Sequence, residues 1–450
     1  MSQNIEKKTF HIVSLGCDKN NVDADSMSQL LKAAGYKPVS NPTSAEIVIV
    51  NTCGFIDSAK EESYQALEEL AAGKKSGQRI IAAGCLTQRY GEEIAQRVPR
   101  VDGILGTRRW MDIVDEVERA SQSLPAESRF KLSKARTVGT DEHGTQRISV
   151  QGASAYIKIA DGCSRACAFC AIPLIKGPTV SRPTEAILNE ARSLQEMGIR
   201  EIVLIAQNTT DYGRDLGMKN RLAHLLKEMT AAVPKIDWIR IMYAFPGFVS
   251  DELIEVMATH KQITPYLDMP LQHAHSAVLK RMGRPANMDW VYKTLEKMRK
   301  DIPGIALRTT FIVGYPGETE KEFKALLDFI DEIRFDKLGA LKYSHEAGTP
   351  AEIFGDTVPD EVKEERLRLL MGKQQQISLE INRSFMGKEL DVLIEGKGQG
   401  ISIGRSYRDA PKVDGLVLVE GDLPIGKMAT VQISNAMVYD LSGTVEARRR

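Results

Sequence analysis

Long hydrophobic runs and an excess of charge of either sign are both missing from this 450-residue chain. No apolar run approaches the roughly 18 residues that span a bilayer, and the first nine residues are polar and charged rather than of signal-peptide type. We therefore expect a cytoplasmic protein that does not enter a membrane. Lysine plus arginine and aspartate plus glutamate each number 60, so the chain as a whole lacks the basic surface of nucleic-acid-binding proteins.

Internal repeats and low-complexity tracts are also absent, and cysteine is sparse, with six residues. The length alone suggests about two to four domains, and a hydrophobic content of 42% is sufficient for packed cores. Because cytosolic thiols are kept reduced and rarely form structural disulfides, the six cysteines point to metal binding or catalysis.

Three regions differ in pattern, and the first is an α/β domain predicted over residues 8–120. Its β-type runs are His11–Leu15, Glu46–Val50 and Arg79–Ala83, and its helices are expected near Asp23–Ala34, Lys60–Ala72 and Glu92–Val98. Alternation of strands and helices is typical of a parallel sheet. Residues 121–148 are polar and lack periodicity, so they are predicted to form a linker.

The second region, residues 149–380, repeats strand–helix units, which predicts a full or partial (β/α) barrel. Its six β-type runs are Tyr156–Ala160, Glu201–Ala206, Trp238–Tyr243, Tyr266–Leu271, Ile305–Val313 and Lys337–Tyr343. A highly charged helix near Pro359–Gln376 closes it. Within that helix, Lys363–Arg366 is interpreted as a solvated face.

The third region, residues 381–450, contains β-type runs only and predicts a small β-barrel. The runs are Glu389–Glu395, Ile401–Tyr407, Leu416–Val419 and Ala429–Ile433. Gly396, Gly398 and Gly400 have the spacing of a nucleotide loop, but no helix follows them, so a hairpin turn is predicted instead.

Three cysteines form a compact set, Cys163, Cys167 and Cys170, on one short loop after the first barrel run. Three thiolates at this spacing can bind three irons of a cubane cluster and leave the fourth iron open. The open iron can bind S-adenosylmethionine, which a reduced cluster cleaves to a 5′-deoxyadenosyl radical. The alternatives are three buried core cysteines, which the polar flanking residues oppose, and a zinc site, which lacks a nearby fourth ligand.

The other three cysteines, Cys17, Cys53 and Cys85, are far apart in the sequence, but each directly follows a β-type run. Residues just beyond the carboxyl ends of parallel strands gather at one edge of the sheet. The three thiols are therefore expected to converge on a second cluster. The alternative is that they are unrelated small residues at strand ends.

At these residues the sequence strongly resembles the radical S-adenosylmethionine methylthiotransferases, over nearly its whole length. The resemblance covers the dispersed cysteines, the C-x-x-x-C-x-x-C loop and a terminal barrel of the TRAM type. It implies a transferase that installs a methylthio group on an unactivated carbon. It also implies two [4Fe-4S] clusters with S-adenosyl-L-methionine, the second cluster taking part in sulfur delivery.

Three stretches, residues 14–20, 51–62 and 404–411, look like the RimO-type branch, whose members modify an aspartate of small-subunit ribosomal protein twelve. Asp18 and Asn208 depart from that branch, which commonly has Pro and Asp at these positions. The resemblance implies that protein as the substrate, modified at the β-carbon of the aspartate. It also implies an electron donor such as flavodoxin and a monomeric enzyme.

Cofactor contacts are predicted at Phe169, which precedes the last loop cysteine, and at Gly314 and Gly317, which follow a strand. In radical enzymes with this loop, the aromatic position commonly lies by the adenine. The glycines let backbone approach a ligand, although the neighbouring Thr319 could simply cap a helix. Gln207, at the end of the second barrel run, is a further predicted cofactor contact. His273 and His275 could contact substrate or be ordinary hydrogen-bonded histidines.

The charge of the terminal region bears on the acceptor. From residue 381 to the end, basic residues number 10 and acidic residues 9, and three of the basic ones are Arg448, Arg449 and Arg450. A barrel that grips RNA phosphates should be basic, so a protein acceptor is favoured. Methylthiolation of a transfer-RNA adenosine remains the first alternative, and a non-catalytic iron–sulfur carrier or RNA-binding module the second.

Overall fold

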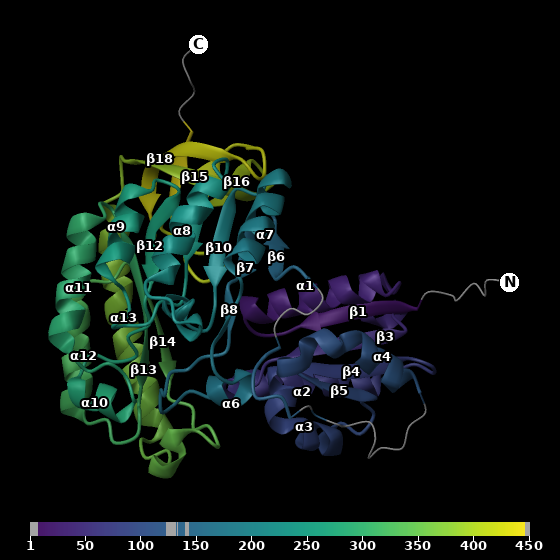
Figure 1. Ribbon diagram of the computed structural model, residues 1–450. Helices are drawn as coiled ribbons and strands as arrows, with labels where there is room; N and C mark the ends of the chain where they lie inside the picture. The colour runs from purple at the N-terminus through teal and green to yellow at the C-terminus, as the bar shows by residue number, and fades with distance from the viewer. Residues whose placement is uncertain (1–7, 123–131, 133, 140–143, 446–450) are drawn as a thin grey trace. The chain divides into compact units, whose positions relative to one another are not determined.

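A computed structural model of the chain describes residues 8–122, 132, 134–139 and 144–445 (Figure 1). The chain divides into two compact units. The first contains the residues up to Ser149 together with Lys158–Arg182 and Glu346–Thr349. The second contains Val150–Ile157, Pro183–His345 and the residues from Pro350 onward. Each unit is described by itself.

A five-stranded sheet forms the centre of the first unit, and all of its neighbouring strands are parallel, as predicted. The strand order is β2-β1-β3-β4-β5. The strands are β1 (Thr9–Ser14), β2 (Lys37–Pro38), β3 (Ile47–Thr52), β4 (Arg79–Gly84) and β5 (Gly103–Gly106). The sequence runs identified β1, β3 and β4 but not the two short strands at the edges.

Helices cover both faces of this sheet, as Figure 1 shows. The helices are α1 (Asp18–Ala33), α2 (Asp57–Ala72), α3 (Cys85–Arg97) and α4 (Ile113–Ser121). On one face α1 and α4 pack on Ile47 and Ile49, and on the other α2 and α3 pack on Val48 and Val50. Every residue of β3 is consequently buried, which explains its unbroken apolar run.

A seven-stranded sheet with the order β14-β13-β12-β11-β10-β7-β6 dominates the second unit. Its strands are β6 (Ile148–Gln151), β7 (Ser154–Lys158), β10 (Glu201–Ile205), β11 (Trp238–Ile241), β12 (Ile263–Asp268), β13 (Ala306–Val313) and β14 (Lys337–Lys342). Neighbours from β10 to β14 are parallel. The six predicted runs all correspond to strands of this sheet, which confirms the partial (β/α) barrel.

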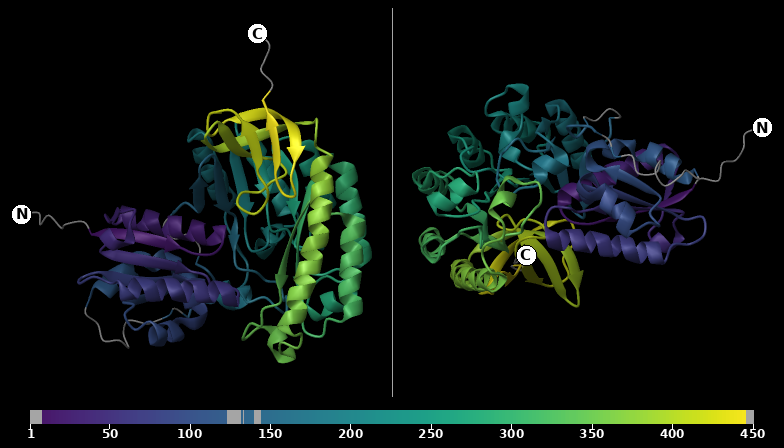
Figure 2. Two further views of the ribbon diagram at one scale, coloured as in Figure 1. Left: turned by 180° about the vertical axis from the view of Figure 1, so that it is seen from behind. Right: turned by 90° about the horizontal axis from the view of Figure 1, so that it is seen from below.

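Helices lie between these strands, as the repeated strand–helix units predicted. They are α7 (Thr184–Glu196), α8 (Arg221–Ala232), α9 (Asp251–Thr259), α10 (Ser276–Arg281), α11 (Met288–Asp301) and α12 (Glu320–Ile333). The long helix α13 (Asp360–Arg383) follows β14 and leads into the terminal strands, as Figure 2 shows. Among the described helices, none combines the length and the apolar character that crossing a bilayer requires.

The terminal strands close into a five-stranded barrel with the order β15-β16-β17-β19-β18. The strands are β15 (Glu389–Gly398), β16 (Ile401–Ser406), β17 (Val417–Glu420), β18 (Met428–Ala436) and β19 (Leu441–Thr444). β15 and β16 are antiparallel and joined through Gln399 and Gly400, both at positive φ, so the predicted hairpin is confirmed. The sequence runs missed β19, which is short and contains glycine.

Candidate metal centre

Three cysteines lie within three residues of the carboxyl ends of three neighbouring strands of the first unit. Cys17 is the residue before α1, Cys53 follows β3 directly, and Cys85 is the first residue of α3. Because β1, β3 and β4 are adjacent and parallel, these positions share one edge of the sheet, as expected. Cys17 is exposed, whereas Cys53 and Cys85 are buried.

The Asn20 side chain connects the three strand ends. Its amide nitrogen donates to the backbone oxygens of Leu15, at 3.0 Å, and Thr52, at 3.1 Å. Its amide oxygen accepts from the Cys85 thiol at 3.6 Å. The Asn51 side chain in turn donates to the Asn20 backbone oxygen at 2.7 Å. One buried amide therefore fixes the backbone on either side of the thiols.

Close backbone approach at this edge requires glycine at two positions. Gly16 has a φ of +84°, and a Cβ there would lie 2.8 Å from the Cβ and 3.0 Å from the Sγ of Cys53. A Cβ on Gly54 would lie 2.6 Å from the Cα of Leu86, next to Cys85. These glycines bring the loops that carry the thiols into contact with one another.

The thiols of Cys17, Cys53 and Cys85 are suitable ligands for iron. Burial raises the pKa of the Cys53 thiol, and burial raises the pKa of Cys85 to about 12. The Cys17 thiol adds to the rise in the pKa of Cys53, and the Cys53 and Cys17 thiols add to the rise in the pKa of Cys85. A metal that binds thiolates releases the thiol protons on binding.

Within the described ranges, no three His, Cys, Asp or Glu side chains are grouped so as to hold a single metal ion. A zinc ion needs its ligands to converge on one point. Thiolates that bind different irons of a cubane do not converge in this way.

The compact cysteine set also lies in the first unit. Its loop runs between β8 (Ala160–Asp161) and α6 (Ile172–Lys176), and β8 pairs with β9 (Val180–Ser181). The backbone N–H of Cys163 donates to the Gly177 oxygen at 3.0 Å, and that of Cys170 to the Cys167 oxygen at 3.1 Å. All six cysteines of the chain carry thiols rather than disulfides.

The two cysteine sets are linked by apolar packing within this unit. Cys85 packs with Ala171 and Ile175, which directly follow the compact loop. In addition, the guanidinium of Arg108 donates to the backbone oxygens of Ile175, at 2.9 Å, and Leu174, at 2.6 Å. The loop of the barrel region is therefore anchored on the domain that carries the dispersed cysteines.

The predicted cofactor contacts fall in both units. Phe169 is half-buried in a turn of the first unit. Gln207, Gly314 and Gly317 lie in the second unit at the carboxyl ends of β10 and β13. The side-chain oxygen of Gln207 is enclosed and accepts no hydrogen bond from the described residues, which leaves an acceptor for a ligand.

The two glycines have intramolecular partners. Glu318 accepts from the backbone N–H of Gly314 at 2.5 Å, and the Thr357 hydroxyl accepts from that of Gly317 at 3.0 Å. A Cβ on Gly314 would lie 2.3 Å from the Cγ of Lys363. Thr319 caps α12 in a capping box with Glu322, which confirms the capping alternative for that residue.

The prediction that Lys363–Arg366 forms a solvated helix face is wrong for two of its four residues. Lys363 and Arg366 are 3% and 6% exposed. The Lys363 ammonium binds Asp356 at 2.6 Å, and the Arg366 guanidinium lies 3.5 Å from Glu318. The spacing of three residues places both cations on the inner side of α13, while Glu364 and Glu365 are exposed.

The two histidines after β12 have structural partners. His273 is fully buried, and its Nδ1 accepts from the backbone N–H of His275 at 3.0 Å. The Nδ1 of His275 accepts from the N–H of Ala277 at 3.3 Å and caps α10. Of the two alternatives predicted for His275, the structure therefore shows a hydrogen-bonded histidine that caps a helix.

The stretch 404–411 of the closed barrel lies against the amino ends of the barrel strands in the second unit. Arg405 pairs with Glu201, the first residue of β10, at 2.6 Å. Asp409 pairs with Lys337, the first residue of β14, at 2.6 Å. Arg405 and Asp409 are 1% and 4% exposed. These residues of the branch-specific stretch therefore hold the closed barrel in place rather than meeting a substrate.

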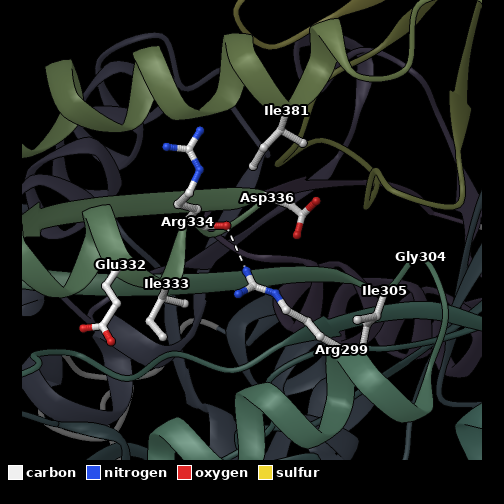
Figure 3. A pocket seen from close by; sticks show the side chains of 8 residues that line it. All are labelled: Arg299, Gly304, Ile305, Glu332, Ile333, Arg334, Asp336 and Ile381. Atoms are coloured by element: carbon white, nitrogen blue, oxygen red, sulfur yellow. Dashed lines mark hydrogen bonds between the residues drawn. The ribbon is translucent and has the colours of Figure 1, made fainter.

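A cavity of about 410 Å³ lies at the same amino ends, where Gly304 and Ile305 precede β13 and Asp336 precedes β14. Figure 3 shows Arg299 donating to the backbone oxygen of Arg334 across it, at 2.9 Å. Sites in parallel (β/α) folds form at the carboxyl ends of the strands. This cavity is therefore not the candidate active site.

Sequence reasoning missed a group of buried charges beside the cysteines, which includes Asp23, Asp161 and Lys176. It also missed Glu346, which is 2% exposed and binds Arg89 at 2.7 Å and Lys60 at 3.2 Å. Arg89 donates as well to the backbone oxygen of Gly54, next to Cys53, at 3.0 Å. An available signal was lysine within or directly after an apolar run, as at Lys176.

Comparison with protein families assigns a description to each region of the chain. Residues 9–106 match the model described as Uncharacterized protein family UPF0004. Residues 157–330 match the Radical SAM superfamily, and residues 386–445 match the TRAM domain.

Full-length relatives carry one name. A protein of Roseiflexus sp. (strain RS-1) is 46% identical, with 96% of each chain covered. A protein of Chloroflexus aurantiacus is 47% identical, with 96% of this chain and 99% of the relative covered. Both are named ribosomal protein uS12 methylthiotransferase RimO.

Solved structures with a similar fold are radical enzymes. The methyltransferase TsrM of Kitasatospora setae superposes with a TM-score of 0.55 at 12% identity, over 82% of this chain and 89% of that one. The cobalamin-dependent enzyme OxsB gives a TM-score of 0.51 at 15% identity, over 80% of this chain and 56% of that one. At these identities the likeness extends to the fold alone.

Proposed function

Because the chain belongs to the RimO family of ribosomal protein uS12 methylthiotransferases, we propose that it adds a methylthio group to the β-carbon of an aspartate of ribosomal protein uS12. It is a radical S-adenosylmethionine enzyme that transfers a sulfur-containing group. The observation that carries the proposal is the presence of two sets of three thiols in one compact unit.

The residues of the compact loop fit a [4Fe-4S] cluster, and those of the dispersed set fit a second one. Cys163, Cys167 and Cys170 would hold the first. When bound there, a reduced cluster supplies the electron that cleaves S-adenosylmethionine. Three thiols leave one coordination position for that molecule, and Phe169, on the same loop, is the side chain of the first unit proposed to contact it.

Cys17, Cys53 and Cys85 would hold the second cluster at the sheet edge. Asn20 and the close approach at Gly16 fix these thiols in advance. A position fixed in this way favours sulfur delivery, because a carbon radical is short-lived and its partner must already be in place.

The closed barrel supports a protein acceptor over transfer RNA. Apart from the three terminal arginines, the region from residue 381 onward contains seven basic residues. Two of these, Arg405 and Arg408, are buried in ion pairs with Glu201 and Asp336. These two cations are therefore not available to contact phosphates, which favours a protein acceptor.

The test is mass spectrometry of ribosomal proteins and of transfer RNA from cells that lack this chain. Loss of the methylthio mass from one uS12 aspartate, with methylthio-adenosines retained, is expected. An unchanged uS12 together with loss of methylthio-adenosine would instead identify transfer RNA as the substrate. Both methylthiolation activities require the purified protein to release 5′-deoxyadenosine. A non-catalytic iron–sulfur carrier would release none.

A further inference from the structure

Glu346 is a buried carboxylate that a distant part of the sequence contributes to the first unit. It belongs to the segment Glu346–Thr349, which is grouped with the first unit although it follows β14 in the chain. Its side chain is 2% exposed, and its Oε2 accepts from the guanidinium of Arg89 at 2.7 Å and from the ammonium of Lys60 at 3.2 Å. One carboxylate oxygen therefore neutralises two cations that are largely withdrawn from solvent.

The two cations lie on the helices that follow two of the dispersed thiols. Lys60 is on α2, which begins shortly after Cys53. Arg89 is on α3, which begins at Cys85. The Glu346 carboxylate therefore joins two helices whose amino ends carry or adjoin these thiols.

Arg89 makes the connection to the thiol loop itself. Its guanidinium donates to the backbone oxygen of Gly54, directly after Cys53, at 3.0 Å. It also donates to the backbone oxygen of Ala347 at 2.9 Å, and its side chain is 5% exposed. A guanidinium presents several donors in a fixed fork, so one group can bind the carboxylate and the loop together. The position of Gly54 is thus set by a cation whose own position depends on Glu346.

The backbone at Gly54 is packed tightly against the residues around Cys85. A Cβ on Gly54 would lie 2.6 Å from the Cα of Leu86 and 3.1 Å from the carbonyl carbon of Cys85. The backbone N–H of Cys53 donates to the Ser63 hydroxyl on α2 at 2.9 Å. Releasing Gly54 would therefore change the spacing between the Cys53 and Cys85 thiols.

We propose that Glu346 is a positioning residue that, through Arg89, fixes the Cys53 loop in the arrangement that a cluster needs. This inference rests on the proposed function, which assigns a cluster to the dispersed thiols. Groups that orient the ligands of a metal commonly matter for its affinity, although they do not touch the metal. Glu346 has that relation to Cys53.

Neutralising Glu346 should affect its two cations differently. Lys60 keeps Asp57 at 2.5 Å as a second carboxylate partner. Arg89 keeps the backbone oxygens of Gly54 and Ala347 but loses its ion pair. A buried guanidinium without a counter-charge is costly. We therefore expect the Arg89 side chain to move toward solvent and release the loop.

Hydrogen exchange of the metal-free, full-length chain tests this without relying on activity. Glu346→Gln keeps the size of the side chain and removes its charge. Exchange of the Cys53 amide is expected to become about tenfold faster, the factor for losing one hydrogen bond to a charged group. Unchanged exchange at Cys53 overturns the inference.

Asp102→Asn is the matched control. Asp102 is 7% exposed, binds the Lys74 ammonium at 2.6 Å and accepts from the backbone N–H of Ile80 at 2.7 Å. It lies at the amino ends of β4 and β5, away from the sheet edge that carries the thiols. Asp102→Asn should speed exchange at Ile80 and leave Cys53 as in wild type. Equal acceleration at Cys53 in both variants would reflect a general loss of stability and would overturn the inference.

Iron binding is measured in the full chain with Cys163, Cys167 and Cys170 replaced by alanine, so that only the dispersed thiols can hold a cluster. After anaerobic reconstitution, Glu346→Gln in this parent is expected to bind about half of the parent's iron or less. Asp102→Asn should bind as much as the parent. A parent without iron contradicts the second cluster of the proposed function, whereas equal iron in the parent and Glu346→Gln overturns this inference alone.

Arg89→Lys is a second variant, which also serves if Glu346→Gln does not fold. Lysine keeps a positive charge beside Glu346 but lacks the fork of donors that also reaches Gly54. Faster exchange at Cys53 and lower iron binding are therefore expected, as for Glu346→Gln. Wild-type exchange and full iron in Arg89→Lys would show that the loop is not held through Arg89, and would overturn the inference.

Discussion

The substitution Gly16→Ala should disturb the proposed cluster site of Cys17, Cys53 and Cys85. It should leave the proposed site on the compact cysteine loop intact. Gly16→Ala places a Cβ 2.8 Å from the Cβ of Cys53, and the positive φ adds strain on the order of 1 kcal/mol. We expect the loop of Cys53 to move and the iron content after reconstitution to fall toward half of the wild-type value.

Gly77→Ala is the control for Gly16→Ala. Gly77 has a similar φ of +80°, but a Cβ there meets nothing within 4 Å. This variant should lose comparable stability on thermal unfolding and keep its full iron content. Equal iron in the two variants would show that contact between Gly16 and Cys53 does not matter for the centre.

At the scale of residues, the sequence predicted the six thiols but not their surroundings. Cys53 and Cys85 could be placed because each directly follows an apolar run. Lys176 and Glu346 could not be placed, because their partners Asp23 and Arg89 are more than 150 residues away in the chain. Burial of a charge depends on such long-range pairing, which local patterns do not reveal.

The strands of the second unit depend on the closed barrel through Glu201 at the start of β10. Its carboxylate binds Arg240 at 2.7 Å and Arg405 at 2.6 Å, and all three side chains are at most 1% exposed. Glu201→Gln leaves the buried Arg240 guanidinium without a carboxylate, while Arg405 keeps Glu395 at 2.6 Å, so it should lower the free energy of unfolding by about 3 kcal/mol. Denaturant unfolding measures this loss.

Glu365→Gln is the control, because the pair of Glu365 with Arg368 is exposed on α13 and such pairs contribute little. No measurable change is expected for it. A loss in Glu365→Gln as large as that in Glu201→Gln would contradict the role assigned to burial.

The contribution of Glu201 should also depend on pH. Burial raises the pKa of its carboxyl, but Arg405 and Arg240 outweigh burial and lower the pKa from 4.5 to about 2. A lowered carboxyl pKa stabilises the folded state above about pH 4.5, and this stabilisation is lost as the pH falls toward 2. The difference in unfolding free energy between wild type and Glu201→Gln should therefore shrink across that range. A constant difference would exclude an ionised Glu201 as its source.

At the scale of elements, apolar runs predicted the long strands. The missed strands β2, β5, β6, β9 and β19 have two to four residues, and β5 and β19 contain glycine. Such strands are held by pairing with a neighbour rather than by their own residues. These short strands form because the rest of the sheet provides a neighbouring strand to pair with. A local sequence pattern carries no information about that neighbour.

At the scale of the molecule, the assignment of the compact cysteine loop to the first unit was not predictable from sequence. Residues 158–182 begin within the first barrel run, and the pattern placed them in the barrel region. Their contacts with Arg108 and Asp23 group them with the first compact unit. The domain boundaries expected from the sequence remain a prediction.

Two sets of three thiols predict about eight irons per chain after anaerobic reconstitution, four for each set. Replacing Cys163, Cys167 and Cys170 together by alanine should leave about half of that iron, because the dispersed thiols remain. Iron analysis with protein quantification measures it. Iron at the full level in the triple variant would show that the compact loop is not a ligand set.

The two thiol sets should have separable roles, since only one of them is proposed to bring S-adenosylmethionine to an iron. Cys53→Ala removes a thiol at the sheet edge and leaves the cysteines of the compact loop in place. It should still release 5′-deoxyadenosine while making little methylthiolated uS12. Cys167→Ala should lose both products. Both products are quantified for each variant under reducing, oxygen-free conditions.

Two outcomes would contradict this separation of roles. Full methylthiolation by Cys53→Ala would show that the dispersed thiols do not deliver sulfur. Loss of 5′-deoxyadenosine in Cys53→Ala, with the remaining cluster intact by spectroscopy, would show that the two sites act only together. That second outcome has a physical route in this chain, because Cys85 packs on Ala171 and Ile175 directly after the compact loop. The spectroscopic control therefore decides whether a lost activity reflects lost chemistry or a displaced loop.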